Sequence, residues 1–137
     1  MINTFSTNYN EIKGHLNFYI DHCLTDYSSK RNFDFGPPHK YVSKLSPYIR
    51  RRYISENKVI GLISKKFKLR KVEKFIQEIF WRTYWRGWLE LHPQVYSEFQ
   101  KNITTYEILN KTGIKCFDNW TDELIETGYL HNHARMW

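Results

Sequence analysis

The sequence contains few of the residues that build disulfide frameworks, metal sites or membrane spans. Its two cysteines, Cys23 and Cys116, lie far apart among 137 residues and form no metal-type spacing. No apolar run approaches the roughly 20 residues of a transmembrane helix, and the N-terminus lacks the basic start and apolar stretch of a secretion signal. These absences predict a reduced, cytoplasmic protein of one domain, with no membrane partner.

Familiar nucleotide and catalytic motifs are also missing. Neither a Gly-x-Gly-x-x-Gly fingerprint nor a Walker sequence occurs, which argues against a Rossmann-type or P-loop site. His131 and His133 are two residues apart, point in different directions on a helix and have no third ligand nearby, so we expect no metal site. The other histidines show no pattern with a nucleophile or an acid, and hydrolytic catalysis is not supported.

Positive charge and aromatic side chains are abundant instead. Lys and Arg number 21 against 14 Asp and Glu, and the net charge of +7 favours an anionic partner such as nucleic acid. Aromatic residues make up 18% of the chain, more than a core of this size ordinarily takes up, so some rings are candidates for stacking on a ligand. The charge runs at residues 50–52 and 65–74 are more often solvated faces, and we assign them no site role.

Helix signals run through the whole chain, and no alternating strand pattern is convincing. Apolar residues at three- and four-residue steps predict a helix over residues 10–24, and a Gly-Pro-Pro stretch predicts a long loop over 25–42. Further helices are predicted from Ser55, over 71–91, and briefly within 92–102. The predicted fold class is therefore all-α.

Helix boundaries follow from capping residues. Ser46 is expected to cap a helix whose first residue is Pro47, a favoured start. After a loop predicted over residues 112–120, Thr121 is expected to cap a short helix that stops at Gly128.

The long helix has two unlike sides. An aliphatic stripe consists of Val72, Ile76, Ile79, Phe80, Thr83 and Gly87, and the opposite side carries Glu78, Trp81, Trp85 and Trp88, flanked by Arg82 and Arg86. The helix is therefore either buried all round or presents an aromatic, charged wall to a ligand. A stacking ring, an acceptor and a cation together are what a base or a flavin needs, which favours the wall.

A second candidate site lies before the helix that begins with Ser-Pro. Ser43 and Ser46 place hydroxyls where helix N–H groups are unpaired, and Lys44 adds positive charge. Such a site can hold phosphate or pyrophosphate, although a serine in this position is more often only a cap.

Four segments together resemble the FAD-binding helical domain of the DNA photolyase and cryptochrome family. They read "YSSKRNFD", "VSKLSPYIR", "KFIQEIFWRTYWR" and "FDNWTDELIETGYLHNHARMW", in that order, and the resemblance covers about residues 15–137. It implies a helical bundle like the first half of that domain, so residues 1–137 would form a partial FAD-binding domain without the antenna α/β domain.

The resemblance also implies which residues bind FAD. Tyr27 and the segment Val42, Ser43, Lys44, Leu45 and Ser46 would hold the pyrophosphate and adenine side. Arg82 resembles an arginine that lies against the cofactor, and Asn132 and Arg135 resemble residues that line the flavin and the substrate cavity. Val42 stands where the family commonly has threonine, so one phosphate-directed hydroxyl is missing.

The implied activity is light-driven repair of pyrimidine dimers in UV-damaged DNA by a flavoprotein, a carbon–carbon lyase. Glu78 and Trp81 resemble the pair that meets the dimer after it is flipped out of the duplex. Arg31 matches an arginine that contacts DNA phosphate, and Trp85 is a further candidate DNA contact. Bond splitting belongs to reduced FAD, whereas the protein supplies orientation and electrostatics.

The family's FAD domain continues beyond the last of these motifs. The chain is therefore expected to form the first half of a cofactor pocket, to bind FAD weakly or not at all alone, and to have a separately encoded second half as a candidate partner. Two alternatives stay open: a cryptochrome-like FAD-binding protein without repair activity, and a basic helical module that binds DNA or a partner after losing flavin chemistry.

Overall fold

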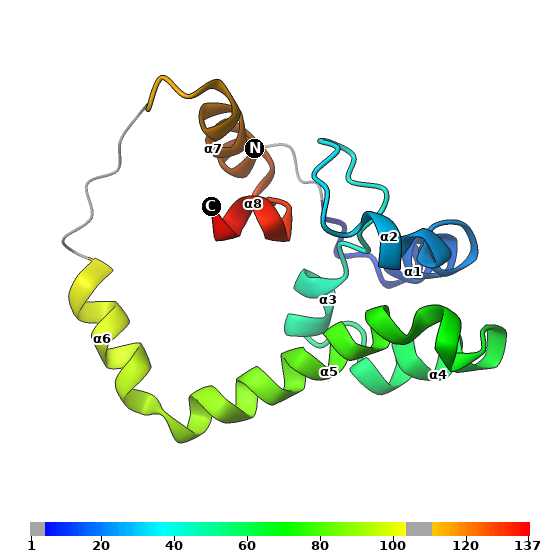
Figure 1. The fold of residues 1–137 in the computed structure, drawn as a ribbon. Coiled ribbons are helices and arrows are strands. Elements are labelled where there is room, and N and C mark those ends of the chain that lie inside the picture. The colour runs from blue at the N-terminus through cyan, green and yellow to red at the C-terminus, as the bar shows by residue number, and fades with distance from the viewer. Residues whose placement is uncertain (1–4, 104–110) are drawn as a thin grey trace.

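The computed structural model describes residues 5–103 and 111–137. Every regular element within these ranges is helical, which confirms the all-α prediction. The elements in chain order (Figure 1) are α1 Tyr9–His22, the 3-10 turn η1 Leu24–Asp26, α2 Tyr27–Lys30, α3 Ser46–Arg50, α4 Glu56–Lys66, α5 Leu69–Leu91, α6 Pro93–Ile103, α7 Lys115–Thr127 and α8 Asn132–Met136. None of these helices has the length and apolar character required to cross a lipid bilayer.

The core lies where α1, α3, α4 and the first half of α5 meet. The side chain of Asn8 caps α1 by accepting from Asn10 N at 2.9 Å, and Ser55 caps α4 by accepting from Lys58 N at 3.2 Å. Apolar residues at helical spacing then face inward. The most deeply buried apolar residues of the core are Ile12, Leu16, Ile20, Leu24, Leu45, Val59 and Ile63.

The stretch predicted as one long loop after the first helix is partly helical. Residues 24–30 form η1 and α2, and the irregular loop is confined to residues 31–45. Leu24 is buried in the core and Tyr27 packs edge-on against Phe75 of α5. Tertiary packing therefore outweighs the turn-forming composition of this segment.

The long helix α5 is buried at one end only. Val72, Ile76 and Ile79 face the core as predicted, but Phe80 is 58% exposed, so its place in the buried stripe was wrong. The reason is that α5 continues past the core, and Figure 1 shows its second half leaving the other helices before α6 turns back.

The prediction of a loop over residues 112–120 is also wrong from Lys115 onward, because α7 begins there. The carboxylate of Asp118 accepts bonds from the backbone N–H groups of Thr112 (2.8 Å) and Gly113 (3.1 Å), and this fixes the preceding turn. Thr121 lies within the helix and donates to a carbonyl one turn earlier, so it is no cap. Gly128 ends the helix as predicted, with φ of +67°.

Candidate functional site

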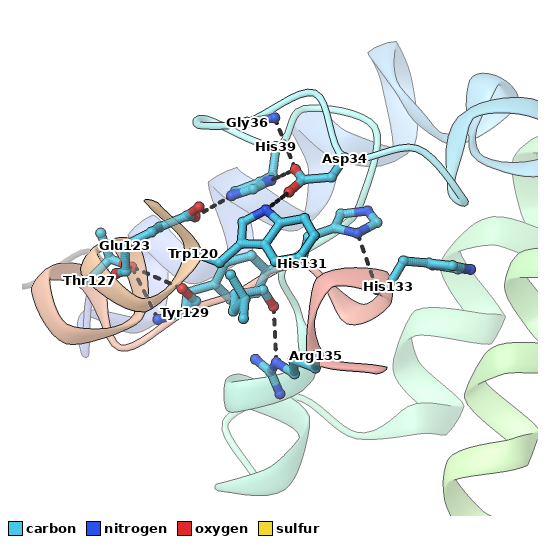
Figure 2. A network of polar contacts seen from close by, with 11 residues as sticks. Asp34, Gly36, His39, Trp120, Glu123, Thr127, Tyr129, His131, His133 and Arg135 are labelled. Carbon is cyan, nitrogen blue, oxygen red and sulfur yellow. Dashed lines mark hydrogen bonds and ion pairs between the residues drawn. The ribbon is translucent and has the colours of Figure 1, made fainter. Parts of the chain in front are cut away.

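A polar network joins the loop of residues 31–45 to α7 (Figure 2). Asp34 accepts from Gly36 N at 2.9 Å and from the indole N–H of Trp120 at 3.0 Å. His39, only 5% exposed, directs Nε2 at the carboxylate of Glu123. Segments more than 80 residues apart in sequence are thereby held together by partly buried polar contacts.

Two more imidazoles adjoin this network. The ring of His131 lies 5.9 Å from that of His39, nearly parallel to it, and its Nδ1 accepts from His133 N at 3.2 Å, which caps α8. Burial lowers the pKa of His131, so the ring is neutral at physiological pH. The buried Nε2 of His131 and Nδ1 of His133 have no hydrogen-bond partner among the described residues.

The predicted phosphate segment is irregular and tightly held. Ser43 accepts from Leu45 N at 3.3 Å, its carbonyl lies 2.7 Å from His15 Nε2, and Leu45 is buried. Lys44 has φ of +50°, the left-handed region that non-glycine residues rarely adopt. Ser46 is the exposed first residue of α3 and makes no capping bond, so its predicted role as a cap was wrong.

The segment of residues 42–46 meets the C-terminal motif, residues 129–135, at the ring of Tyr129. The ammonium of Lys44 lies 6.0 Å from the centre of the Tyr129 ring, and the guanidinium of Arg135 lies 5.7 Å from it. Arg135 also donates from Nε to the carbonyl of Leu130 at 3.0 Å, whereas Asn132 is exposed at the start of α8. Burial raises the pKa of Tyr129 to about 12, so its hydroxyl stays neutral beside the two cations. Two predicted cofactor-binding segments are thus brought together.

The residues predicted to meet DNA are arranged differently. Arg31 donates to the carboxylate of Glu78 in a close contact, and its guanidinium lies 5.9 Å from the ring of Tyr27. A predicted phosphate-binding cation and a predicted base acceptor therefore neutralise each other. Both side chains are partly exposed, at 26% and 40%, so the pair is open to exchange with a ligand.

An aromatic wall runs along the second half of α5. It consists of Trp81, Tyr84, Trp85 and Trp88, whose neighbouring ring centres are 5.4 to 6.4 Å apart. Trp81 and Trp85 are about half exposed, at 50% and 51%. Beside the wall, Arg82 lies 3.8 Å from Glu56 of α4. Of the two possibilities left by the sequence, the described residues show the exposed wall rather than a helix buried all round.

The described residues show no metal site, and the pocket beside Tyr27 is small. Within residues 5–103 and 111–137, no three His, Cys, Asp or Glu side chains lie close enough to hold a metal ion. A pocket of about 170 Å³ between α2 and the start of α5 is lined by Tyr27, Ser28 and residues 70–75. Sites for ligands of drug size occupy roughly 300–1,000 Å³, so FAD would not be enclosed there.

Sequence reasoning missed the network around His39. This histidine follows two prolines in a loop, and although Asp34 lies five residues earlier in the same loop, the carboxylate that meets its Nε2, Glu123, is 84 residues away. Only the fold brings these residues together. The one available signal was the unusual density of polar and aromatic residues in the last thirteen positions.

The chain is similar to a deoxyribodipyrimidine photo-lyase of Alkalihalophilus pseudofirmus, with 25% identity over 138 aligned residues. The alignment covers 88% of this chain and 27% of the relative, so the chain spans about a quarter of that protein's length. No family model matches the chain, and no solved structure matches it. The similarity supports a relationship to the photolyase family.

Proposed function

We propose that this chain is part of a photolyase-like flavoprotein module that binds FAD and UV-damaged DNA. The observation that carries the proposal is the meeting of Lys44 and Arg135 at Tyr129, because these cations come from two segments that were separately predicted to bind the cofactor. The similarity to a photolyase supports the same conclusion.

The residues present fit the anionic part of FAD. A diphosphate needs cations and N–H donors, and Lys44 supplies a cation beside the ring of Tyr129. Arg135 lies against the same ring, where the flavin side of the site begins. The buried, unpartnered Nε2 of His131 is a further polar atom near this segment. In the proposed arrangement Ser43, Lys44 and Ser46 hold the phosphates, Tyr27 the adenine side, and Arg82, Asn132 and Arg135 the flavin side.

Bound reduced FAD would supply the light-driven electron transfer that splits the dimer. The chain's own contribution is to receive the flipped base, which requires a stacking surface and an acceptor for the base edge. Trp81 offers the half-exposed ring, and Glu78 offers the carboxylate once Arg31 turns toward a DNA phosphate. The pair of Arg31 and Glu78 therefore exchanges its mutual contact for two contacts with DNA.

The direct test is to illuminate the purified chain with FAD, a reductant and an oligonucleotide that contains one cyclobutane dimer. Light-dependent loss of the dimer supports repair, and a Glu78→Gln variant should slow it while retaining FAD. Glu126→Gln, the same change at an exposed residue outside the proposed site, is the matched control. No repair in light, with FAD shown to be bound, would assign the chain to the cryptochrome-like alternative.

We also propose that further helices of an FAD-binding domain cover α6 and α7. The chain exposes 10574 Å², whereas a compact monomer of its mass exposes about 7,700 Å². Neither helix contains a buried residue, although each has an apolar stripe. The stripes consist of Val95, Tyr96, Phe99 and Ile103 on α6, and of Phe117, Leu124 and Ile125 on α7.

The partner follows from the comparison, because the matched photolyase has about three quarters of its length outside the alignment. We expect its segment C-terminal to the matched residues, added in trans, to bind this chain and raise its affinity for FAD. Phe99→Glu should abolish the association, and Gln94→Glu, which adds the same charge at an exposed polar position of α6, should serve as the control for charge alone. A chain that instead forms a stable homodimer in sedimentation experiments would contradict this assignment.

The aromatic wall favours one alternative, a basic module that binds single-stranded DNA without flavin. Exposed rings with cations alongside are sufficient for sequence-independent stacking. In that case Trp85→Ala would weaken binding of undamaged and damaged oligonucleotides equally, and FAD would have no effect. A preference for the dimer-containing oligonucleotide would contradict the alternative.

A further inference from the structure

The two segments proposed to bind FAD belong to different parts of the chain. Residues 42–46 end the loop that follows α2, whereas residues 129–135 follow α7 and enter α8. A ligand that touches both needs them at a fixed separation, because misplacing one group by about 1 Å can cost roughly a hundredfold in function. Some contact must therefore hold the loop against α7.

Figure 2 shows two partly buried bonds that make this connection. Trp120 donates to Asp34 at 3.0 Å, and Nε2 of His39 meets the carboxylate of Glu123. The side chains of His39 and Glu123 are only 3% and 11% exposed. Charge-assisted bonds shielded from water in this way are about twice as strong as neutral ones.

His39 holds the more central position of the two loop residues. Its ring also lies 5.3 Å from that of Tyr129 and 5.9 Å from that of His131, so it touches the start of the C-terminal motif directly. The other ring nitrogen, Nδ1, lies 3.3 Å from a carboxylate oxygen of Asp34 in the same loop. His39 therefore contacts α7, the motif and its own loop at once.

We propose that His39 is a positioning residue that sets the separation of Lys44 from Arg135 through its bond to Glu123. This inference rests on the proposed function, since it assigns His39 to the same FAD site without any contact to the cofactor. The contact reaches α7 from Nε2, the ring atom farthest along the side chain. A side chain of the same reach should preserve the separation, and a shorter one should not.

The chain offers a matched pair of substitutions for this test. In His39→Gln the amide nitrogen reaches about as far as Nε2 and can still donate to Glu123, whereas in His39→Asn it stops near the place of Nδ1. Hydrogen exchange of the whole chain should accelerate in residues 34–45 and 115–136 for His39→Asn, with α1 and α4 unchanged. His39→Gln should remain close to the wild type. Unchanged exchange in both variants would overturn the proposal.

Ligand affinities separate positioning from general stability. FAD spans both segments, whereas ADP needs only the phosphate side, so His39→Asn should weaken FAD about tenfold and leave ADP within about twofold. Equal losses for both ligands, or equal losses in the Gln and Asn variants, would overturn positioning. If the wild-type chain binds no FAD at millimolar concentration even with the C-terminal photolyase segment added in trans, the proposed function fails, while hydrogen exchange of the chain alone still decides the role of His39.

Discussion

Replacing Asp34 with asparagine should destabilise the fold, because the carboxylate is surrounded by groups that need an acceptor. It accepts from Gly36 N and from the indole N–H of Trp120, and it lies 3.3 Å from Nδ1 of His39. The side chain of Asp34 is 15% exposed, so water replaces little of a lost contact. Asparagine keeps the shape but has one accepting atom, and its NH2 group must face a donor.

The magnitude follows from the number of bonds at risk. A hydrogen bond to a charged group contributes about 1.5–3 kcal/mol, and Asp34→Asn weakens one of the two bonds to this side chain and breaks the other. We expect the free energy of unfolding to fall by about 2–3 kcal/mol, which is a large part of the roughly 5–15 kcal/mol typical of a domain. The corresponding fall in Tm is on the order of 10 °C.

Thermal and urea unfolding, followed by tryptophan fluorescence and circular dichroism, measure this change. Asp26→Asn is the control, because Asp26 pairs with Lys30 at 2.7 Å on an exposed surface, where such pairs contribute about 0–1 kcal/mol. If the two variants differ by less than about 0.5 kcal/mol, Asp34 does not hold the loop to α7 and the importance given to the network is wrong.

Three further predictions concern charged groups. Because burial raises the pKa of Tyr129 to about 12, its hydroxyl ionises first in the unfolded chain as pH rises, and this costs up to about 2–3 kcal/mol of stability between pH 10 and 12. Burial also raises the pKa of Tyr19, Tyr27 and Tyr48, so Tyr129→Phe should reduce the loss of stability in urea titrations by the share of Tyr129 and leave the rest. Burial lowers the pKa of His131, so stability falls as pH drops below about 6.5, and His131→Gln should flatten that slope. Glu78→Gln frees Arg31, so affinity for undamaged DNA should rise up to about fivefold at low salt, and an unchanged affinity by fluorescence anisotropy would contradict this.

The sequence predicts the helices well where local chemistry decides them. Ser55 caps α4, Pro47 lies in the first turn of α3 and Gly128 stops α7, each through a backbone requirement that a single residue meets. The start of α7 was missed because Thr112 and Gly113 look like a turn, whereas the acceptor that organises the turn, Asp118, comes later within the helix itself.

The candidate site, too, could be predicted from the sequence only in part. The motifs containing Lys44 and Arg135 are legible in the sequence, and the structure brings them together at Tyr129. The pairing of Arg31 with Glu78 was not foreseen, because it depends on where α2 lies against α5. His39 was passed over for the same reason. Contacts between distant segments follow from packing, which no local pattern specifies.

Because α5 is buried at one end only, a small tilt of the helix moves its two ends by very different distances. Its last buried residue is Ile79, and the twelve residues from there to Leu91 span about 18 Å. A 10° tilt about Ile79 would move Trp81 by only about 0.5 Å, but would move the start of α6 by about 3 Å. The ring of Trp81, close to Ile79, therefore keeps its position even when the far end of α5 moves. A partner that binds α6 could therefore shift the far end of α5 by several times the distance that Trp81 moves.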